Sequence, residues 1–241
     1  GPTWTHALRT GSPAIDAGDP GYFCGEGAPC EDQRGVGFSR TQNGRVDMGA
    51  VEYLDSTLLV DRNDDTNAAE AQACEDTVPD DCSLRGAISL TNSDSTTAYT
   101  ITVPAGTYTL QLYSGGGEED ANAEGDLDIL GLVTIEGAGQ AETIIQAGAS
   151  LATAIDRVFE VGDGYAPIQT VTFRDLTIRY GQAFTGGGHA LENIGEDVFL
   201  ERVSVIDSDQ PNAPEAIGGA VYGHSHSVLN IPDSSFSNND A

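Results

Sequence analysis

Apolar and polar residues alternate in short segments over much of the chain, and three segments repeat one pattern. The copies span 171–181, 198–208 and 229–239, so their starts lie 27 and 31 residues apart. In register they form three apolar columns and one hydroxyl column: Phe173, Leu200 and Ile231; Leu176 and Val203; Ile178, Val205 and Phe236; Thr177, Ser204 and Ser235. This period predicts stacked copies, because one copy cannot bury its apolar face alone.

The segments have the composition of strands. They are short, rich in Val, Ile, Thr and Phe, and separated by Gly, Asn and Asp. No stretch has a helical period long enough to connect parallel strands. We therefore expect an all-β fold, a right-handed parallel β-helix (solenoid). A β-propeller is the alternative, but it needs four antiparallel strands per repeat and these repeats show about three.

One short helix is expected near 83–91. Ser83 can cap it, and Leu84, Ala87 and Ile88 fall on one face. Gly86 weakens this helix by about 1 kcal/mol relative to Ala. Such a helix would cover the apolar side chains and free strand edges where a stack begins.

Two groups of motifs resemble secreted bacterial β-helix proteins. The helix region reads Asp81-Cys-Ser-Leu-Arg-Gly-Ala-Ile-Ser-Leu90 and resembles the CSLREA motif that opens such domains, although Gly86 stands where that family has Glu. Gly218-Gly-Ala-Val221 and Phe236-Ser-Asn-Asn239 are similar to the GGA and FxxN pairs of polymorphic outer-membrane proteins.

The first 53 residues resemble a different part of these proteins. The phrases at 1–8, 11–20, 31–35 and 44–53 are similar to the C-terminal closing region of β-helix proteins of the choice-of-anchor type. The resemblance implies that this region closes a β-helix that precedes it, or one in a neighbouring copy.

We therefore expect three parts: a closing region at 1–53, an acidic linker with a disulfide loop at 54–82, and the cap with the opening coils of a second β-helix at 83–241. The chain lacks a secretory signal, a membrane-spanning run and an initiator Met. We expect it to be a segment of a longer protein.

The charge is strongly acidic, with 38 acidic and 10 basic residues, a net charge of −28 and no Lys. Such a surface repels nucleic acid and anionic membranes, so neither is expected as a partner. An extracellular protein kept soluble by its charge explains the composition, and a saline or calcium-rich setting is the alternative.

Four cysteines occur as two local pairs, Cys24 with Cys30 and Cys74 with Cys82. Four cysteines allow three connectivities, which the sequence does not distinguish. Disulfides in an oxidising compartment are favoured over zinc, because the spacings differ from those of zinc knuckles.

Asp61, Asn63 and Asp65 have the alternate spacing with which a calcium loop begins. Thr66 stands where an EF-hand has Gly and Gln72 where it has Glu, which excludes an EF-hand. A weaker calcium site at these three residues and a solvated linker stay open as alternatives.

Candidate catalytic groups are few, and no catalytic residue is assigned. Two carboxylate pairs could share a face: Asp207 with Asp209, and Asp175 with Asp233. His224 and His226 form a His-x-His pair without an evident third ligand.

These observations predict a structural or adhesive segment of a large extracellular bacterial surface protein or fibre. Its expected partners are neighbouring copies or adjacent domains arranged head to tail, and surface glycans. One alternative is a carbohydrate-active β-helix enzyme. Another is a glycan-binding adhesin, for which Tyr165, Tyr180 and Tyr222 are candidate contacts.

Overall fold

The structure is a computed structural model. It describes residues 12–15, 17–25, 28–33, 40–41, 45–52, 56–75, 78–94, 97–113, 115, 119–164, 168–183, 187–209 and 219–239. The chain divides into two compact units, Gly1–Asp55 and Ser56–Ala241.

Carboxylates organise the described loops of the first unit. Glu52 accepts hydrogen bonds from the Asp47 backbone N–H at 3.1 Å and from the Arg40 guanidinium at 2.5 Å. The Glu52 backbone N–H donates to Asp32 at 3.0 Å. Burial raises the pKa of Glu52. Among its described residues this unit contains no helix or strand, and the motif at 1–8 lies outside them.

The second unit is mostly β, and every pairing between its strands is parallel. The larger sheet has nine strands: β1 (Ser56–Leu59), β2 (Tyr99–Val103), β3 (Gly106–Thr109), β5 (Val133–Gly137), β6 (Thr143–Gln146), β8 (Thr170–Arg179), β10 (Asp197–Ile206), β12 (Val228–Asn230) and β13 (Ser235–Ser237). The smaller sheet has four: β4 (Leu127–Ile129), β7 (Phe159–Val161), β9 (Leu191–Asn193) and β11 (Val221–Gly223).

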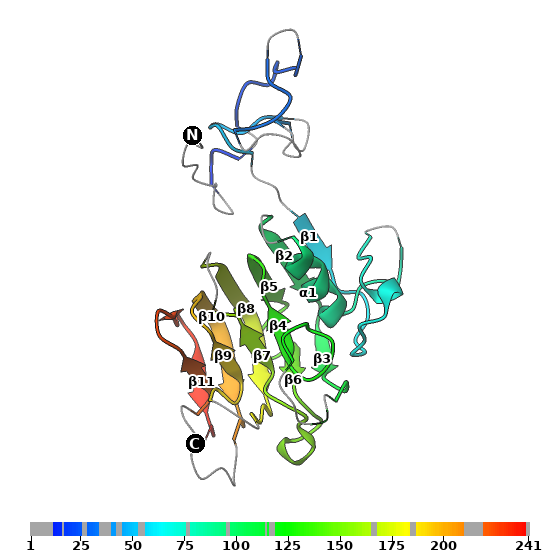
Figure 1. Ribbon diagram of the computed structural model, residues 1–241, viewed down its shortest axis with the longest axis vertical. Helices are drawn as coiled ribbons and strands as arrows, with labels where there is room; N and C mark the ends of the chain where they lie inside the picture. Colours follow the sequence, from blue (N-terminus) through cyan, green and yellow to red (C-terminus); the bar gives the residue numbers. More distant parts are fainter. Residues whose placement is uncertain are drawn as a thin grey trace. The chain divides into compact units, whose positions relative to one another are not determined.

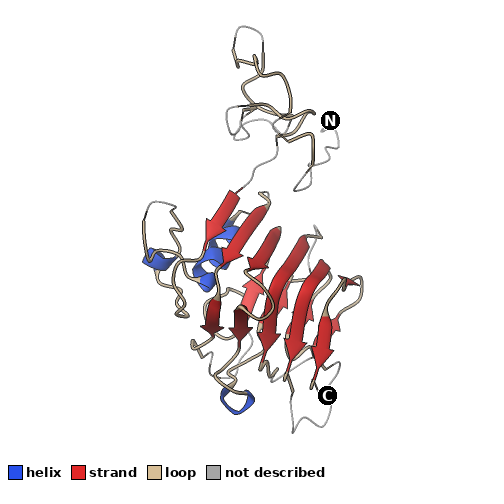
Figure 2. Ribbon diagram, turned by 180° about the vertical axis from the view of Figure 1, so that it is seen from behind, coloured by secondary structure: helices blue, strands red, loops and turns tan. Residues whose placement is uncertain are grey.

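The chain passes repeatedly between the two sheets. Each strand of the smaller sheet is preceded and followed by a strand of the larger one, so both sheets grow in sequence order. Figures 1 and 2 show the strands side by side along the second unit, with α1 (Leu84–Ser93) near β1 and β2. Short 3₁₀ turns lie at η1 (Ala69–Ala71) and η2 (Leu151–Thr153). A mostly β fold with parallel sheets agrees with the sequence pattern, whereas the propeller alternative required antiparallel strands.

The predicted apolar columns are confirmed between β8 and β10, and the third column also continues into β13. Phe173 pairs with Leu200, and Val205 pairs with Ile178 on one side and Phe236 on the other. Side chains of β8 and β10 that point inward have no exposed surface: Val171, Phe173, Leu176, Ile178, Val198, Leu200, Val203 and Val205. The core lies between the two sheets, where the rings of Phe159 and Phe173 are 4.7 Å apart.

The long strands bend at the same place in successive repeats. Asp175 in β8 and Arg202 in β10 both have a φ of 53°, and Asp233 between β12 and β13 has a φ of 54°. This left-handed conformation is uncommon outside Gly, Asn and Asp. Because each repeat bends at the same position, the apolar residues before and after the bend stay in register from one repeat to the next.

Most of the segment 54–82, expected as an acidic linker with a disulfide loop, belongs to the second unit. β1 pairs with β2 in register, Leu58 beside Ile101, and so begins the larger sheet. Val60 and Cys82 are buried in the same core. The segment joins the second unit because Leu58 and Val60 are buried in its core, with Leu58 in the column that Ile101 continues.

Candidate functional site

Of the first two predicted calcium ligands, one is hydrogen-bonded to backbone groups and the other is exposed. The Asp61 carboxylate accepts hydrogen bonds from the backbone N–H of Asp80 at 2.5 Å and of Cys82 at 2.9 Å. Asn63 is exposed. Asp61 therefore holds the loop that the Cys74–Cys82 disulfide closes.

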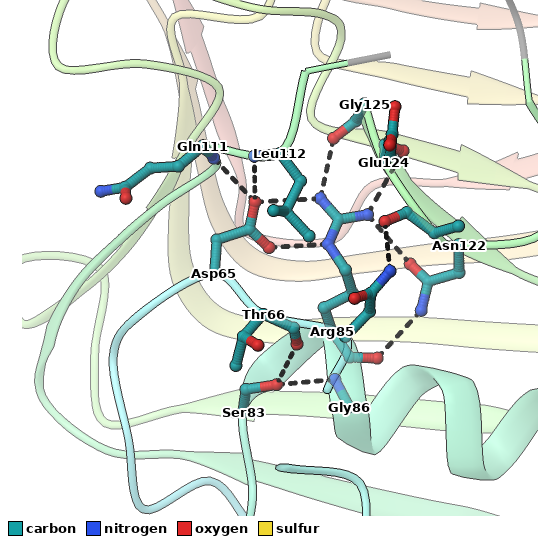
Figure 3. Close-up of polar contacts among 12 residues, drawn as sticks. Asp65, Thr66, Ser83, Arg85, Gly86, Gln111, Leu112, Asn122, Glu124 and Gly125 are labelled. Atoms are coloured by element: carbon teal, nitrogen blue, oxygen red, sulfur yellow. Dashed lines mark hydrogen bonds and ion pairs between the residues drawn. The ribbon is translucent and has the colours of Figure 1, made fainter. Parts of the chain in front are cut away.

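The third predicted ligand, Asp65, contacts a different set of groups (Figure 3). One oxygen accepts from the Arg85 Nε–H at 2.6 Å, and the other accepts from the backbone N–H groups of Gln111 at 2.7 Å and Leu112 at 2.9 Å. The structure thus does not bring the three predicted ligands together. In the part of the chain that it describes, no group of three or more His, Cys, Asp or Glu side chains is placed to hold a metal ion.

Arg85 lies at the centre of a buried polar network (Figure 3). The side chains of Arg85 and Asp65 are 0% and 3% exposed. The guanidinium also donates to the backbone carbonyls of Gly125 at 2.8 Å and Asp126 at 2.6 Å. A buried charge of this kind is tolerated only when it is paired and hydrogen-bonded. Arg85 therefore ties α1 to the loop before β4.

The start of α1 confirms the predicted cap and explains its glycine. Ser83 Oγ accepts from the Gly86 N–H at 2.9 Å and donates to the Thr66 carbonyl at 2.8 Å. A Cβ atom at Gly86 would lie 1.9 Å from the Ala71 carbonyl oxygen. Gly86 has a low helix propensity, but it is required at this position because η1 packs directly against it.

The end of α1 covers the free edge of the smaller sheet. Asn92 donates to the Asp128 carbonyl at 2.6 Å and accepts from the Leu130 N–H at 2.8 Å. Asn122 accepts from the Asp128 N–H of β4 at 3.3 Å and donates to the Arg85 carbonyl of α1 at 2.9 Å. Side-chain amides thus pair with strand groups that no further strand covers. We call α1, the 61–67 loop and the edge of β4 the capped end.

The opposite end of the sheets has no such cover among the described residues. Leu229, Ile231 and Phe236 are 39%, 43% and 40% exposed, although each continues a column that is fully buried in β10. Val228 is 45% exposed. We call β11, β12 and β13 the open end.

A second buried polar cluster, which the sequence did not predict, lies on the smaller sheet. Asp128, Glu160 and Glu192 occupy equivalent positions in β4, β7 and β9. Arg157, 1% exposed, pairs with Glu160 and lies 2.8 Å from Glu192 and 3.6 Å from Asp126. The sequence did contain a signal for this cluster: a single acidic residue stands between two apolar residues in the strands at 127–129 and 159–161.

Burial changes the ionisation of this cluster. It raises the pKa of Asp126 to about 9, with the negative charge of Asp128 adding to the effect. It raises the pKa of Asp128 to about 8, against a hydrogen bond from the Asn122 backbone. Both carboxyls are therefore protonated at neutral pH. The acidic residues Asp126, Asp128, Glu160 and Glu192 are at most 7% exposed, so the cluster is internal to the fold.

In each carboxylate pair considered for catalysis, one member is held in a contact between repeats. Both oxygens of Asp175 accept from the Arg202 guanidinium, at 2.7 and 2.6 Å, and this contact lowers the pKa of Asp175. Asp233 follows Arg202 in the same bend column. Asp207 accepts from the Asn238 amide at 3.0 Å. These contacts join adjacent repeats along the stack.

The histidines do not converge. His224 Nε2 lies 2.7 Å from Glu192, and His226 is exposed with a φ of 75°. His189 is fully buried, and burial lowers its pKa. His6 lies outside the described residues.

The aromatic residues considered for glycan binding are separated. Tyr222 belongs to β11 of the smaller sheet, where its ring lies 5.0 Å from that of His224. Tyr180 follows β8 of the larger sheet and packs under the Arg179 guanidinium at 4.7 Å. Tyr165 lies outside the described residues.

One of the two cysteine pairs forms a disulfide. Cys74 and Cys82 are bonded at 2.06 Å, which confirms this pairing. Cys24 and Cys30 are exposed free thiols, so the bond expected between them is absent from the structure. Hydrogen bonding to Cys24 raises the pKa of the Cys30 thiol, which disfavours the thiolate needed for oxidation.

Comparisons with known proteins add no family. No family model matches the chain, and neither do curated proteins or solved structures. Within the described residues, no helix has the length and apolar character needed to cross a membrane.

Proposed function

We propose that the chain is a structural segment of an extracellular bacterial surface protein, and that its second unit is a right-handed parallel β-helix acting as a stiff rod. The observation that carries this proposal is the register. Equivalent residues of successive repeats pair with each other in both sheets. A stack of this kind lengthens by adding repeats, each of which contacts only its neighbours.

The path of the chain supports the β-helix. Each time the chain leaves the larger sheet, it adds one strand to the smaller sheet and then returns to the larger sheet one position further along. Parallel strands joined in this way have right-handed connections in nearly all proteins. The likeness of residues 81–90 to the CSLREA motif agrees with a helix at the start of the stack.

Polar contacts favour a structural role over catalysis. The carboxylates Asp175 and Asp207 bond to the repeat that follows each of them. The acids of the smaller sheet are buried around Arg157. A glycosidase instead needs two carboxylates that reach a substrate.

An extracellular location agrees with two features. The Cys74–Cys82 disulfide is typical of proteins that fold in an oxidising compartment. The net charge of −28 keeps a protein soluble in a saline medium.

Single-molecule pulling of the full chain between two marker domains tests the proposal. We expect a resisting step whose contour-length gain corresponds to the second unit, at about 3.3–3.6 Å per residue released. Strands that pair along their whole length and share one core should yield together.

A Leu200→Asp variant is the control, because a charge buried in the core removes the resisting step. Extension of the native chain without such a step would rule out a stiff rod. Release of reducing sugar ends from neutral or acidic polysaccharides would assign the chain to the enzymes instead.

A further inference from the structure

We infer that a pocket at the capped end binds a neutral hexose unit of a glycan through two neighbouring hydroxyl groups. The pocket is lined by residues 60–64, Asp80, residues 104–105 and Tyr108. Its volume of about 630 Å³ lies within the range of about 300–1,000 Å³ that is typical of small-molecule sites. The inference goes beyond the proposed rod, because it adds a ligand to a structural segment.

Hydrogen bonds hold the lining of the pocket in place. Asp61 accepts from the backbone N–H groups of Asp80 at 2.5 Å and Cys82 at 2.9 Å, and a disulfide closes the same loop. Arg62 donates to the two Asp64 oxygens at 2.7 and 2.6 Å, and to the Asp80 carbonyl at 3.1 Å. These contacts fix the backbone that lines the pocket, so a ligand meets a preformed site.

Two polar side chains of the lining are available to a ligand. Within the described part of the chain, neither the Asn63 amide nor the Asp80 carboxylate has a hydrogen-bond partner, and both residues are exposed. An amide both donates and accepts hydrogen bonds, whereas a carboxylate accepts them. Neighbouring sugar hydroxyls can donate to the carboxylate and accept from the amide, so the pair matches a vicinal diol.

The apolar part of the lining can contact the C–H groups of a sugar ring. Pro104 and Ala105 follow β2 and are exposed. Tyr108 is only 7% exposed and donates its hydroxyl to the Pro104 carbonyl at 3.1 Å, so it supports this turn from within. Small-molecule sites combine apolar surface with a few polar groups in this way.

The charges of the lining favour a neutral ligand. Three carboxylates and one guanidinium line the pocket, so uronic acids and phosphates are repelled. A cation is not required, because the Arg62 guanidinium already pairs with Asp64 and bonds to the Asp80 carbonyl. Both Asp61 oxygens accept from backbone N–H groups, which makes them poor ligands for a metal ion.

Saturation-transfer NMR and calorimetry with the intact chain test the site. The probes are the methyl glycosides of glucose, mannose and galactose. At least one should bind saturably, with a dissociation constant of about 1 mM or below. Methyl glucuronide adds a carboxylate to the ring and N-acetyllysine amide offers an ammonium group. Both should bind at least about tenfold more weakly than the best hexoside.

Substitutions locate the binding. Asp80→Asn removes the charge but keeps the side-chain size, and Asn tolerates the φ of 61° at this position. It should weaken binding of the best hexoside about tenfold, and Asn63→Ala should weaken it about threefold or more. The matched control is Asp120→Asn, which changes the net charge equally in an exposed loop outside the lining and should leave affinity unchanged.

Four outcomes would overturn the inference. They are no saturable binding of any of the three hexosides, tighter binding of the glucuronide, tighter binding of the lysine probe, and equal losses with Asp80→Asn and Asp120→Asn. The pulling experiment does not measure ligand binding, so failure of the inference is distinguishable from failure of the rod.

Discussion

α1 and the strands β11 to β13 lie at opposite ends of the same two parallel sheets. The two ends differ in how far their last apolar side chains are exposed. At the capped end a helix covers the core, and Leu84 and Ile88 are 4% and 0% exposed. At the open end Ile231 and Phe236 are 43% and 40% exposed. The apolar pattern is the same, but among the described residues only the capped end has polar side chains that pair with a strand edge.

The difference lies in how strand edges are satisfied. At the capped end, Asn92 and Asn122 pair with backbone groups of the edge strand β4, and Arg85 pairs with the Asp126 carbonyl directly before it. In a β-stack, apolar alternation specifies repetition, whereas termination requires buried polar side chains whose partners are all present. The two ends should therefore respond very differently to substitution.

The largest effect is expected at Arg85. Arg85→Met leaves the buried Asp65 without its ion partner, and two backbone carbonyls lose their donor. Removing one partner of a buried ion pair costs about 3–5 kcal/mol. Chemical denaturation should show this loss in the free energy of unfolding.

Arg62→Met is the control on the same loop, because the Arg62–Asp64 pair is partly exposed. It should leave stability nearly unchanged. An Asp65→Asn, Arg85→Met double variant should recover part of the loss. Equal effects of the two arginine substitutions would show that the cap does not depend on the buried network.

The second prediction compares a buried and an exposed position of one apolar column. Leu200→Ala removes a fully buried side chain and should cost about 2–5 kcal/mol. Ile231→Ala alters the next position of the same column, where 43% of the residue is exposed, and should cost under about 1 kcal/mol. Denaturation of both variants measures the difference. Similar losses would mean that the open end is covered in solution.

Sequence reasoning found the repeated parallel strands but not the polar contacts of the capped end. The columns through Phe173 and Ile178 were predictable because alternation and a fixed period are local signals. The contacts of Arg85 were not, because they join it to Asp65 and to the Asp126 carbonyl, 20 and 41 positions away. No local pattern encodes such pairings.

The same limit explains the calcium hypothesis. Alternate spacing of Asp61, Asn63 and Asp65 is typical of calcium loops, and spacing does not reveal which lone pairs are already used. Backbone N–H groups of Cys82 and Leu112 occupy them. The cap of α1 was predictable from Ser83, since capping is local.

Gly86 gives the third prediction, where propensity and packing disagree. Helix propensity alone expects Gly86→Ala to stabilise the protein by about 1 kcal/mol. The contact with the Ala71 carbonyl instead predicts a loss of about 1–3 kcal/mol, because the chain must shift to admit a methyl group. Thermal unfolding measures the sign. A higher melting temperature would show that η1 does not pack tightly on α1.

The fourth prediction concerns pH and the capped end. The folded pKa values of Asp126 and Asp128, about 9 and 8, lie above the unfolded value near 3.8. The native state therefore binds more protons between about pH 4 and pH 9, and these groups lower stability as the pH rises through that window. The loss is on the order of 1 kcal/mol or more.

Denaturation at pH 6, 7.5 and 9 should show this decline, and Asp126→Asn should reduce it. Hydrogen exchange should locate the first loss of protection in α1 and β4, which the loop around Asn122 joins. A decline that begins in β12 and β13 would contradict this assignment.

The smallest effect is expected for an ion pair between repeats at the surface. Arg174 lies 2.8 Å from Glu201 and 3.7 Å from Glu136, with 28% of its side chain exposed. Arg174→Ala should cost about 0.2–1 kcal/mol, and the cost should shrink as salt screens the pair. The matched comparison is Arg85→Met in the same salt series, whose loss should persist because water and ions do not reach that pair. If both losses shrink equally with salt, water and ions reach the guanidinium of Arg85. The capped end would then not depend on buried polar contacts, and its stability would not differ in kind from that of the apolar columns.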